Sequence, residues 1–341
     1  MNVERYEKQG RVGGGSYGEV YRAVDRWTGS VVAIKVVNLE LSNEELLSIQ
    51  KEISVLRQVR SPFVTSYHDS FLHGSQLWII MEYCEGGSCA DLLRTERLTE
   101  AHMAVILRDV LQALVYLHAE NKIHRDIKAA NVLLCKDGSV RLADFGVAGQ
   151  LHVQCKRDRA FVGTPYWMSP EVIKQSGYNT KADIWSVGIL AYELAMGEPP
   201  YADLHPMKVL HLIPRNPPPQ LPSSYSPAFR DFVAQCLTRD PLRRPSASEL
   251  LKHKFFKHAG STSLLAAVLA TRSFAKTRPP KKRPADVTTA EAPWWDFGSL
   301  RTTPVEAPVS DPLGTTITPR VWRQNSSVPS NDATIVQLPG P

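Results

Sequence analysis

The chain contains His124-Arg125-Asp126-Ile127-Lys128-Ala129-Ala130-Asn131 and, after a short predicted hairpin, Asp144-Phe145-Gly146. These two stretches decide the fold, because together they supply the side chains that one phosphoryl group needs. Asn131 and Asp144 carry the amide and carboxylate oxygens that Mg²⁺ accepts. Asp126 is spaced to accept a hydrogen bond from an incoming hydroxyl, and Lys128 can reach the same phosphate. Either Asp alone could be an ordinary turn residue, but the two with Asn131 between them predict phosphoryl transfer.

A glycine-rich segment near the N-terminus has the spacing of a phosphate-binding loop. Its Gly-x-Gly-x-x-Gly-x-Val spacing is a weak signal alone, because dinucleotide-binding folds use it before a helix. Here residues 19–24 are rich in β-branched and aromatic types, which predicts a strand. The loop is therefore predicted to be a β-hairpin lid, in which glycines let backbone amides approach phosphate. The candidate nucleotide-binding residues of this lid are Val12, Gly13, Gly14, Gly15, Ser16, Tyr17, Gly18 and Val20.

The next strand, Val32-Ala33-Ile34-Lys35, ends in a lysine. Such a lysine is usually a solvated edge charge. Residues 46–56 come next, with apolar side chains at helical spacing, and Glu52 lies beside that apolar face. The pattern predicts that Glu52 locks Lys35 against the α- and β-phosphates.

An adenine pocket is predicted where the buried-strand pattern Trp78-Ile79-Ile80-Met81 runs into an extended segment. Backbone groups of such a segment can fix a base edge while a few apolar side chains sandwich the ring. The same residues could be ordinary core, and the two roles are compatible. The candidates are Val12, Val20, Ala33 and Leu133 for the sandwich, Met81 for the back wall, and Glu82 and Cys84 in the extended segment.

In this order, the motifs resemble a eukaryotic protein kinase catalytic domain over about residues 6–256. The resemblance implies an α+β bilobal fold, with a small β-rich N-lobe over about 6–83 and a larger helical C-lobe over about 84–256, and it implies ATP and Mg²⁺ as cofactors. Residues 163–168, 181–186 and 198–200 resemble the sterile-20-like kinases. Residues 144–151, 204–210 and 212–214 are similar to germinal-centre kinase group III, which includes fungal members.

The resemblance also implies roles for residues outside the phosphate site. Lys128 together with Thr164 is the pattern of serine/threonine kinases. Glu171 and Arg244 are expected to form a buried two-point ion pair, and Asp183 is expected to hold the backbone of the catalytic loop. Val147, directly after Asp-Phe-Gly, favours threonine as the acceptor in similar kinases.

Two other classes of protein share parts of this pattern. A pseudokinase that binds nucleotide and acts as a scaffold usually lacks at least one of the key side chains, and Lys35, Asp126, Asn131 and Asp144 are all present. A small-molecule phosphotransferase would not need the substrate loop at 163–171. We therefore expect a non-specific serine/threonine protein kinase that acts on protein substrates.

The chain departs from the family pattern at two positions. Ser169 stands where relatives have Ala, a change of little expected consequence. Ala160 stands where relatives carry an activating threonine, and residues 147–163 contain no Ser, Thr or Tyr. Activity would then be set by order through Asp158, by homodimerisation, or by a scaffold that clamps the helix bearing Glu52. The alternative is a mobile loop with low basal activity.

Composition fits an enzyme of this class. At 341 residues and 43% hydrophobic, the chain is long enough for two lobes and a tail. A net charge of +6 without a folded nucleic-acid motif argues against nucleic acid as partner. Five cysteines without Cys-x-x-Cys spacing predict reduced thiols rather than disulfides or a zinc site. The absence of a signal peptide and of a long apolar stretch predicts a cytoplasmic protein without membrane insertion.

The remaining segments flank the predicted kinase domain. Residues 1–5 are an N-terminal extension and 257–275 a helical C-terminal extension. Residues 276–341 are rich in Pro, Ser and Thr and are predicted to be disordered. The basic cluster at 276–283 is either a nuclear import signal or a solvated linker. Trp294-Trp295-Asp296-Phe297 either docks to an armadillo-like scaffold through Trp295-Asp296-Phe297 or packs back onto the kinase.

Overall fold

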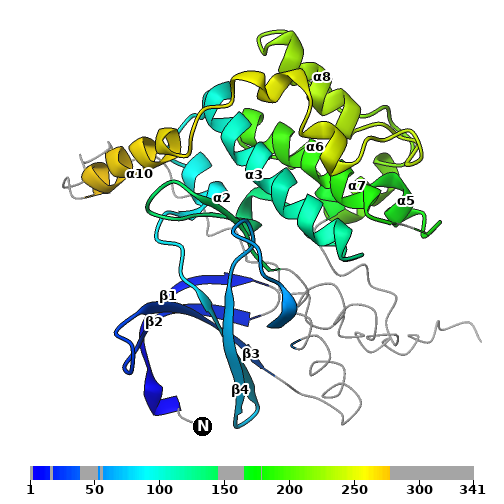
Figure 1. Cartoon of the computed structure of the whole chain (residues 1–341). Helices are drawn as coiled ribbons and strands as arrows, with labels where there is room; N and C mark the ends of the chain where they lie inside the picture. The colour runs from blue at the N-terminus through cyan, green and yellow to red at the C-terminus, as the bar shows by residue number, and fades with distance from the viewer. Residues whose placement is uncertain are drawn as a thin grey trace, which may run out of the picture. The chain divides into compact units, whose positions relative to one another are not determined.

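A computed structural model describes residues 3–15, 18–38, 53, 57–144, 165–177 and 179–276 of the chain. Strands dominate its first part and helices the rest, as Figure 1 shows. The predicted α+β architecture with a β-rich N-lobe and a helical C-lobe is therefore confirmed. Glu52, residues 145–164 with Thr164 among them, and residues 277–341 of the predicted tail lie outside the described residues. Lys276, predicted as the first residue of the tail, is instead the last residue of a helix.

The N-lobe is built on one antiparallel sheet with the strand order β1-β2-β3-β5-β4. Its core contains Ala23, Ile34 and Ile80, which are fully buried, packed with Trp78. These β-branched and aromatic side chains suit a pleated, buried surface. A short 3₁₀ helix, η1 (Val3–Arg5), precedes the strands, which are β1 (Tyr6–Gly15), β2 (Gly18–Asp25), β3 (Val31–Asn38), β4 (Tyr67–His73) and β5 (Gln76–Glu82).

The C-lobe begins with a small second sheet, in which β7 lies between β6 and β8. Its strands are β6 (Gly87–Ser88), β7 (Val132–Leu134) and β8 (Val140–Leu142). Helices make up most of the rest of the lobe: α2 (Cys89–Leu93), α3 (Glu100–Ala119), η2 (Ala129–Asn131), η3 (Pro165–Trp167), α5 (Pro170–Ile173), α6 (Lys181–Met196), α7 (Pro206–Leu212), α8 (Pro227–Cys236), α9 (Ala247–Leu250), η4 (Lys254–His258) and α10 (Ser263–Lys276).

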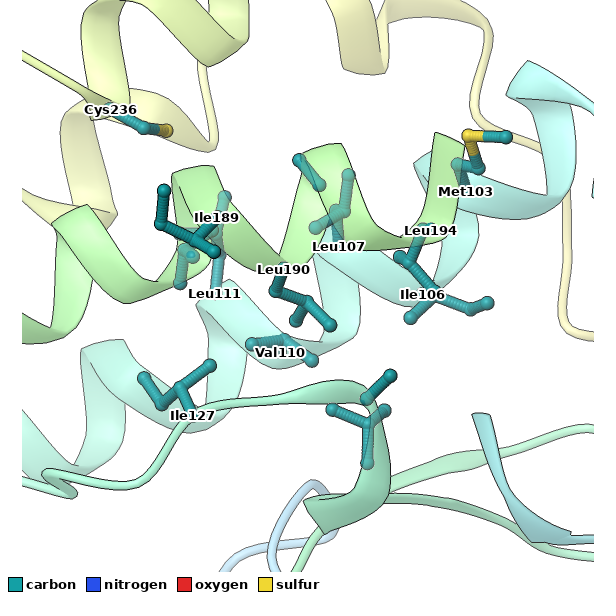
Figure 2. Close-up of a cluster of buried hydrophobic side chains, with 14 of the residues drawn as sticks. Met103, Ile106, Leu107, Val110, Leu111, Ile127, Ile189, Leu190, Leu194 and Cys236 are labelled. Carbon is teal, nitrogen blue, oxygen red and sulfur yellow. The ribbon is translucent and has the colours of Figure 1, made fainter. Parts of the chain in front are cut away.

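Two long helices, α3 and α6, form the centre of the C-lobe. Figure 2 shows their side chains packed together, with Leu107 and Leu111 from α3 near Leu190 from α6. Thr99 caps α3 through the amide of His102, and α6 ends at Gly197 in the left-handed conformation.

The last helix, α10, packs onto the C-lobe rather than extending from it. Leu265 is fully buried in the main core, and Leu269 contacts the same cluster. Arg108 from α3 donates to the carbonyl of Gly260 at 2.8 Å, just before the helix. A helix was predicted in this segment, and the described residues contain one.

Within the described ranges, no helix combines the length and apolar character needed to cross a bilayer.

Candidate active site

The loop that carries Asp126 is fixed by Asp183, a buried carboxylate on α6. Asp183 accepts hydrogen bonds from the backbone amides of His124 and Arg125, both at 2.9 Å. The ring of His118 on α3 lies 2.9 Å from the same carboxylate. Arg125 adopts φ 72°, a left-handed conformation that is costly for a non-glycine residue. The hydrogen bonds from these two backbone amides to Asp183 therefore maintain the strained conformation of Arg125, directly before Asp126.

Three predicted site residues come together on this loop. Asp126 Oδ2 lies 2.9 Å from Lys128 Nζ and accepts a hydrogen bond from Asn131 Nδ2 at 2.8 Å. Asn131 also donates to the Asp126 carbonyl at 2.7 Å. Both of these hydrogen bonds use the side-chain nitrogen of Asn131. Its side-chain oxygen is therefore the atom suited to bind a cation.

Lys35 and Asp144 join the two lobes across the site. Lys35 Nζ lies 2.7 Å from Asp144 Oδ1, although the two residues are 109 positions apart in the sequence. Burial alone would raise the pKa of Asp144, but the Lys35 ammonium, with smaller contributions from His124 and Lys128, offsets this and the pKa is lowered. Asp144 is therefore ionised near neutral pH. Its φ of 60° is a second strained position in the site.

The donor set fits a magnesium nucleotide. Asn131 and Asp144 offer amide and carboxylate oxygens, the hard ligands of Mg²⁺, and Lys35 supplies a cation for phosphate. The predicted lid is a hairpin, since Gly15 pairs with Gly18 at the joined ends of β1 and β2. Gly18 has φ 128°, and a Cβ there would stand 2.0 Å from the Val36 carbonyl oxygen. Only glycine fits this close backbone approach.

Strand register brings the candidate adenine residues to one face of the N-lobe sheet. Val20 pairs with Lys35, and Ala33 pairs with Met81. Paired residues share a face, and Ala33 and Lys35 are two apart on β3, so all four side chains lie on the same side. Val12 lies on β1 and is half exposed, while Leu133 lies on β7 opposite Ser88. Ser16 and Tyr17 lie outside the described residues.

Motif analysis missed Glu193, a buried carboxylate on α6. Glu193 Oε2 accepts hydrogen bonds from the Ala129 amide at 2.9 Å and from Trp167 Nε1 at 2.8 Å. Burial raises the pKa of Glu193 to about 7, against the opposing effect of these donors. It thereby links the catalytic loop to the segment before Ser169. An acidic residue inside a nearly all-apolar helix was the available signal, because a buried carboxylate needs hydrogen-bond partners.

Glu171 and Arg244 form a two-point ion pair beneath this segment. Arg244 Nη1 lies 2.7 Å from Glu171 Oε1, and Nη2 lies 3.2 Å from Oε2. The guanidinium also donates to the carbonyls of Lys181 and Thr238, so a fully buried charge is both paired and hydrogen-bonded. Ser169 is buried in the same region, and its hydroxyl has no hydrogen-bond partner among the described residues.

Comparison with known proteins agrees with this geometry. Residues 6–256 match the family described as Protein kinase domain. The chain is also 48% identical over 313 residues to Serine/threonine-protein kinase ppk11 of Schizosaccharomyces pombe, an alignment that covers 88% of this chain and 100% of that protein. Such similarity over most of the chain identifies the family. The chain belongs to the protein kinase family and is a serine/threonine protein kinase.

Proposed function

We propose that this kinase transfers the γ-phosphate of ATP to protein hydroxyls with Asp126, Lys128, Asn131, Asp144 and Lys35 as its working side chains. The observation that carries the proposal is that two groups of contacting side chains lie on adjoining backbone, since the amide of Ala143, next to Asp144, donates to the carbonyl of Asn131 at 2.8 Å. Asp126 is bonded to Lys128 and Asn131 on one loop, and Lys35 lies 2.7 Å from Asp144 between the lobes. Phosphoryl transfer depends mainly on positioning and on charge neutralisation, and these groups supply both.

Each side chain has a distinct role in this proposal. Asp126 accepts the hydrogen bond of the incoming hydroxyl and orients it, while Lys128 balances charge on the transferred group. Asn131 and Asp144 would hold Mg²⁺, which neutralises phosphate charge when bound. Lys35 holds the α- and β-phosphates, with Glu52 as its expected anchor.

A kinase assay on a generic protein substrate with Mg²⁺ and ATP tests these roles. Asp126→Asn should reduce kcat by at least about 100-fold, because general-base and positioning groups contribute about 10²–10⁴-fold. Asp137→Asn is the matched control, since Asp137 is exposed on the β7–β8 turn. Equal activity in the two variants would refute the role of Asp126. Phosphoamino-acid analysis of the product would test the preference for threonine that Val147 suggests.

We also propose that the chain is a sterile-20-like kinase of germinal-centre group III, acting in stress, polarity or morphogenesis signalling. Its motifs at 163–168, 181–186 and 204–210 support this assignment. Since residues 147–163 carry no hydroxyl, control would come from Asp158, from homodimerisation or from a scaffold. Phosphatase treatment should leave activity unchanged. A large loss that maps to a loop residue such as Thr164 would contradict this, and a gain in Ala160→Thr would indicate that the loop limits activity.

The tail supplies the proposed scaffold contact and the proposed location. Trp295, Asp296 and Phe297 would insert into an armadillo-like scaffold, and the basic cluster at 276–283 would add a nuclear share to a cytoplasmic protein. Deletion of residues 294–297 should abolish scaffold pull-down without lowering activity on a generic substrate. Unchanged binding would end the scaffold proposal. Microscopy of the tagged chain, with and without the basic cluster, tests the location.

A further inference from the structure

Two thiols and a carboxylate meet where the segment between the lobes passes the β7–β8 hairpin. Cys135 Sγ lies 3.7 Å from Cys84 Sγ and 3.8 Å from Glu82 Oε1. All three donor atoms lie within 4.8 Å of one another. Cys84 and Cys135 are free thiols, with Cys84 buried and Cys135 partly exposed.

Strand pairing, not local sequence, assembles this cluster. Glu82 is the last residue of β5, and Cys84 follows it two residues later. Gly86 then donates to the Leu134 carbonyl at 2.8 Å, and β6 pairs with β7. This pairing brings Cys135, at the end of β7, to Cys84 across 51 residues of sequence. The two cysteines are too far apart in the sequence to form a recognisable metal-binding motif.

Two of the three separations between donor atoms match those between ligands of a tetrahedral metal ion, and the third is within 4.8 Å. Zn²⁺ binds Cys sulfur at about 2.3 Å, so two sulfurs on one tetrahedral ion stand about 3.8 Å apart. The two sulfur atoms lie 3.7 Å apart, and Cys135 Sγ lies 3.8 Å from Glu82 Oε1, so both distances are close to this expected separation. Three protein donors leave a fourth position for solvent, as in open zinc sites.

Arg141 supplies the charge balance and the outer contact that such a site needs. Its Nε lies 3.1 and 3.3 Å from the two oxygens of Glu82, and the Ser66 amide donates to Glu82 Oε2 at 3.1 Å. Two thiolates and a carboxylate carry three negative charges, which a divalent cation and one guanidinium cancel. Hydrogen bonds of this kind orient ligating carboxylates and tune metal affinity.

We propose that Glu82, Cys84 and Cys135 form a binding site for a thiophilic divalent cation, Zn²⁺ being the best fit, with Arg141 orienting the carboxylate. The site is separate from Asn131 and Asp144, which offer only hard oxygen donors. It would tie the segment between the lobes to the hairpin that leads to Asp144. By linkage, a bound cation would raise the thermal stability of the kinase.

Titration of the reduced, metal-free, full-length chain with Co²⁺ tests the proposal, because Co²⁺ bound by thiolates absorbs strongly in the near ultraviolet. One equivalent should produce this absorption, and Zn²⁺ should remove it. Cys84→Ala and Cys135→Ala should each lose the absorption, whereas Cys89→Ala should keep it. Cys89 is a fully buried thiol on α2, outside the cluster. Co²⁺ bound only by Asn131 and Asp144 would give no thiolate absorption and would overturn the proposal.

Thermal unfolding provides a second readout that also checks folding of the variants. Zn²⁺ should raise the melting temperature of wild type and Cys89→Ala, and it should leave Cys135→Ala unchanged. Absence of thiolate absorption in wild type, or its survival in Cys135→Ala, would overturn the proposal. So would rapid formation of a Cys84–Cys135 disulfide that occurs equally with and without Zn²⁺, since a bound ion would protect both thiolates.

Discussion

Single buried carboxylates on α6 control the backbone of the active site. Asp183 fixes His124 and Arg125 through their amides, and Glu193, farther along the same helix, reaches Ala129 and Trp167. Neither carboxylate needs to touch the nucleotide for this role. Because both are nearly inaccessible to solvent, their hydrogen bonds cannot be replaced by water without opening the lobe. The reactive loop is therefore positioned from the core outward.

Glu193 should make stability depend on pH in a specific direction. Its pKa is about 7 in the folded protein against an ordinary value of 4.5, so the native state holds a proton that the unfolded state releases. The stabilisation is complete below about pH 4.5 and is lost as pH rises through 7, at about 1.4 kcal/mol for each unit by which the two pKa values differ. Glu193→Gln keeps an oxygen for both donors. Its stability should therefore lack this decline between about pH 4.5 and 7.

Urea unfolding of both proteins at several pH values would measure the difference. Glu198→Gln, at an exposed position five residues later, is the control and should follow the wild-type profile. Parallel profiles for wild type and Glu193→Gln would show that folding does not raise the pKa of Glu193.

At the scale of elements, the β1–β2 hairpin and the packing of helix α10 both depend on glycines at positions where another part of the backbone or a side chain comes close. Gly18 allows β2 to pass the Val36 carbonyl on β3, which shapes the predicted phosphate lid. Gly138, at φ 83°, lets the β7–β8 turn meet the backbone of Thr262 and Ala266 at the start of α10. Gly86 lies beside Leu269 of the same helix. The lid and the last helix are thus both fitted to the chain at positions where a side chain would intrude.

Gly18→Ala should damage nucleotide binding, while Gly10→Ala should not. A Cβ at Gly18 meets a backbone oxygen and forces a disfavoured φ, a strain of about 1–3 kcal/mol. Gly10 lies on the same hairpin with nothing within 4 Å of an added Cβ. The expected result is a raised KM for ATP in Gly18→Ala alone. Similar KM values for the two variants would argue that the lid geometry is not required.

The helix α10 should contribute to the stability of the whole C-lobe. Leu265 is fully buried in the main core, so Leu265→Ala should destabilise by about 2–5 kcal/mol. The adjacent Leu264 is 37% exposed and provides a matched control of smaller effect. Denaturant unfolding followed by circular dichroism would compare them. Equal midpoints would mean that α10 separates from the lobe in solution.

Across the molecule, the sequence supports a prediction of the side chains that phosphoryl transfer would use, but it gives no sign of the contacts that packing decides. Lys35, Asp126, Asn131 and Asp144 could be named because phosphoryl transfer calls for those types. The strands over 19–24, 32–35 and 78–81 could be predicted from their residue types, whereas the division into a β-rich and a helical lobe came with the resemblance to protein kinases. The hydrogen bonds of Glu193 and the contact between Cys84 and Cys135 could not be predicted, because each joins elements that come together only in the folded protein. The contact between Lys35 and Asp144 belongs to both groups: its residues were predictable, and their direct ion pair was not.

This ion pair predicts how nucleotide and metal act on the whole molecule. Lys35 comes from the N-lobe sheet and Asp144 lies just after β8 of the C-lobe, so a ligand that engages both residues stabilises both lobes together. A non-hydrolysable ATP analogue should raise the melting temperature, and Mg²⁺ should add a further increment that a chelator removes. Asp144→Asn should lose the Mg²⁺ increment, because it removes the carboxylate that favours a hard cation.

Differential scanning calorimetry can measure each increment against the same protein without ligand, which accounts for any loss of stability caused by the substitution itself. Asp144→Asn removes the carboxylate that the buried Lys35 contacts, so a lower starting temperature is expected and is not the test. The test is the difference in melting temperature between samples with and without Mg²⁺, both in the presence of the ATP analogue. Asp137→Asn, exposed on the β7–β8 turn, should retain it in full. An equal Mg²⁺ increment in both variants would place the metal away from Asp144 and would remove the basis for coupling the lobes through this residue.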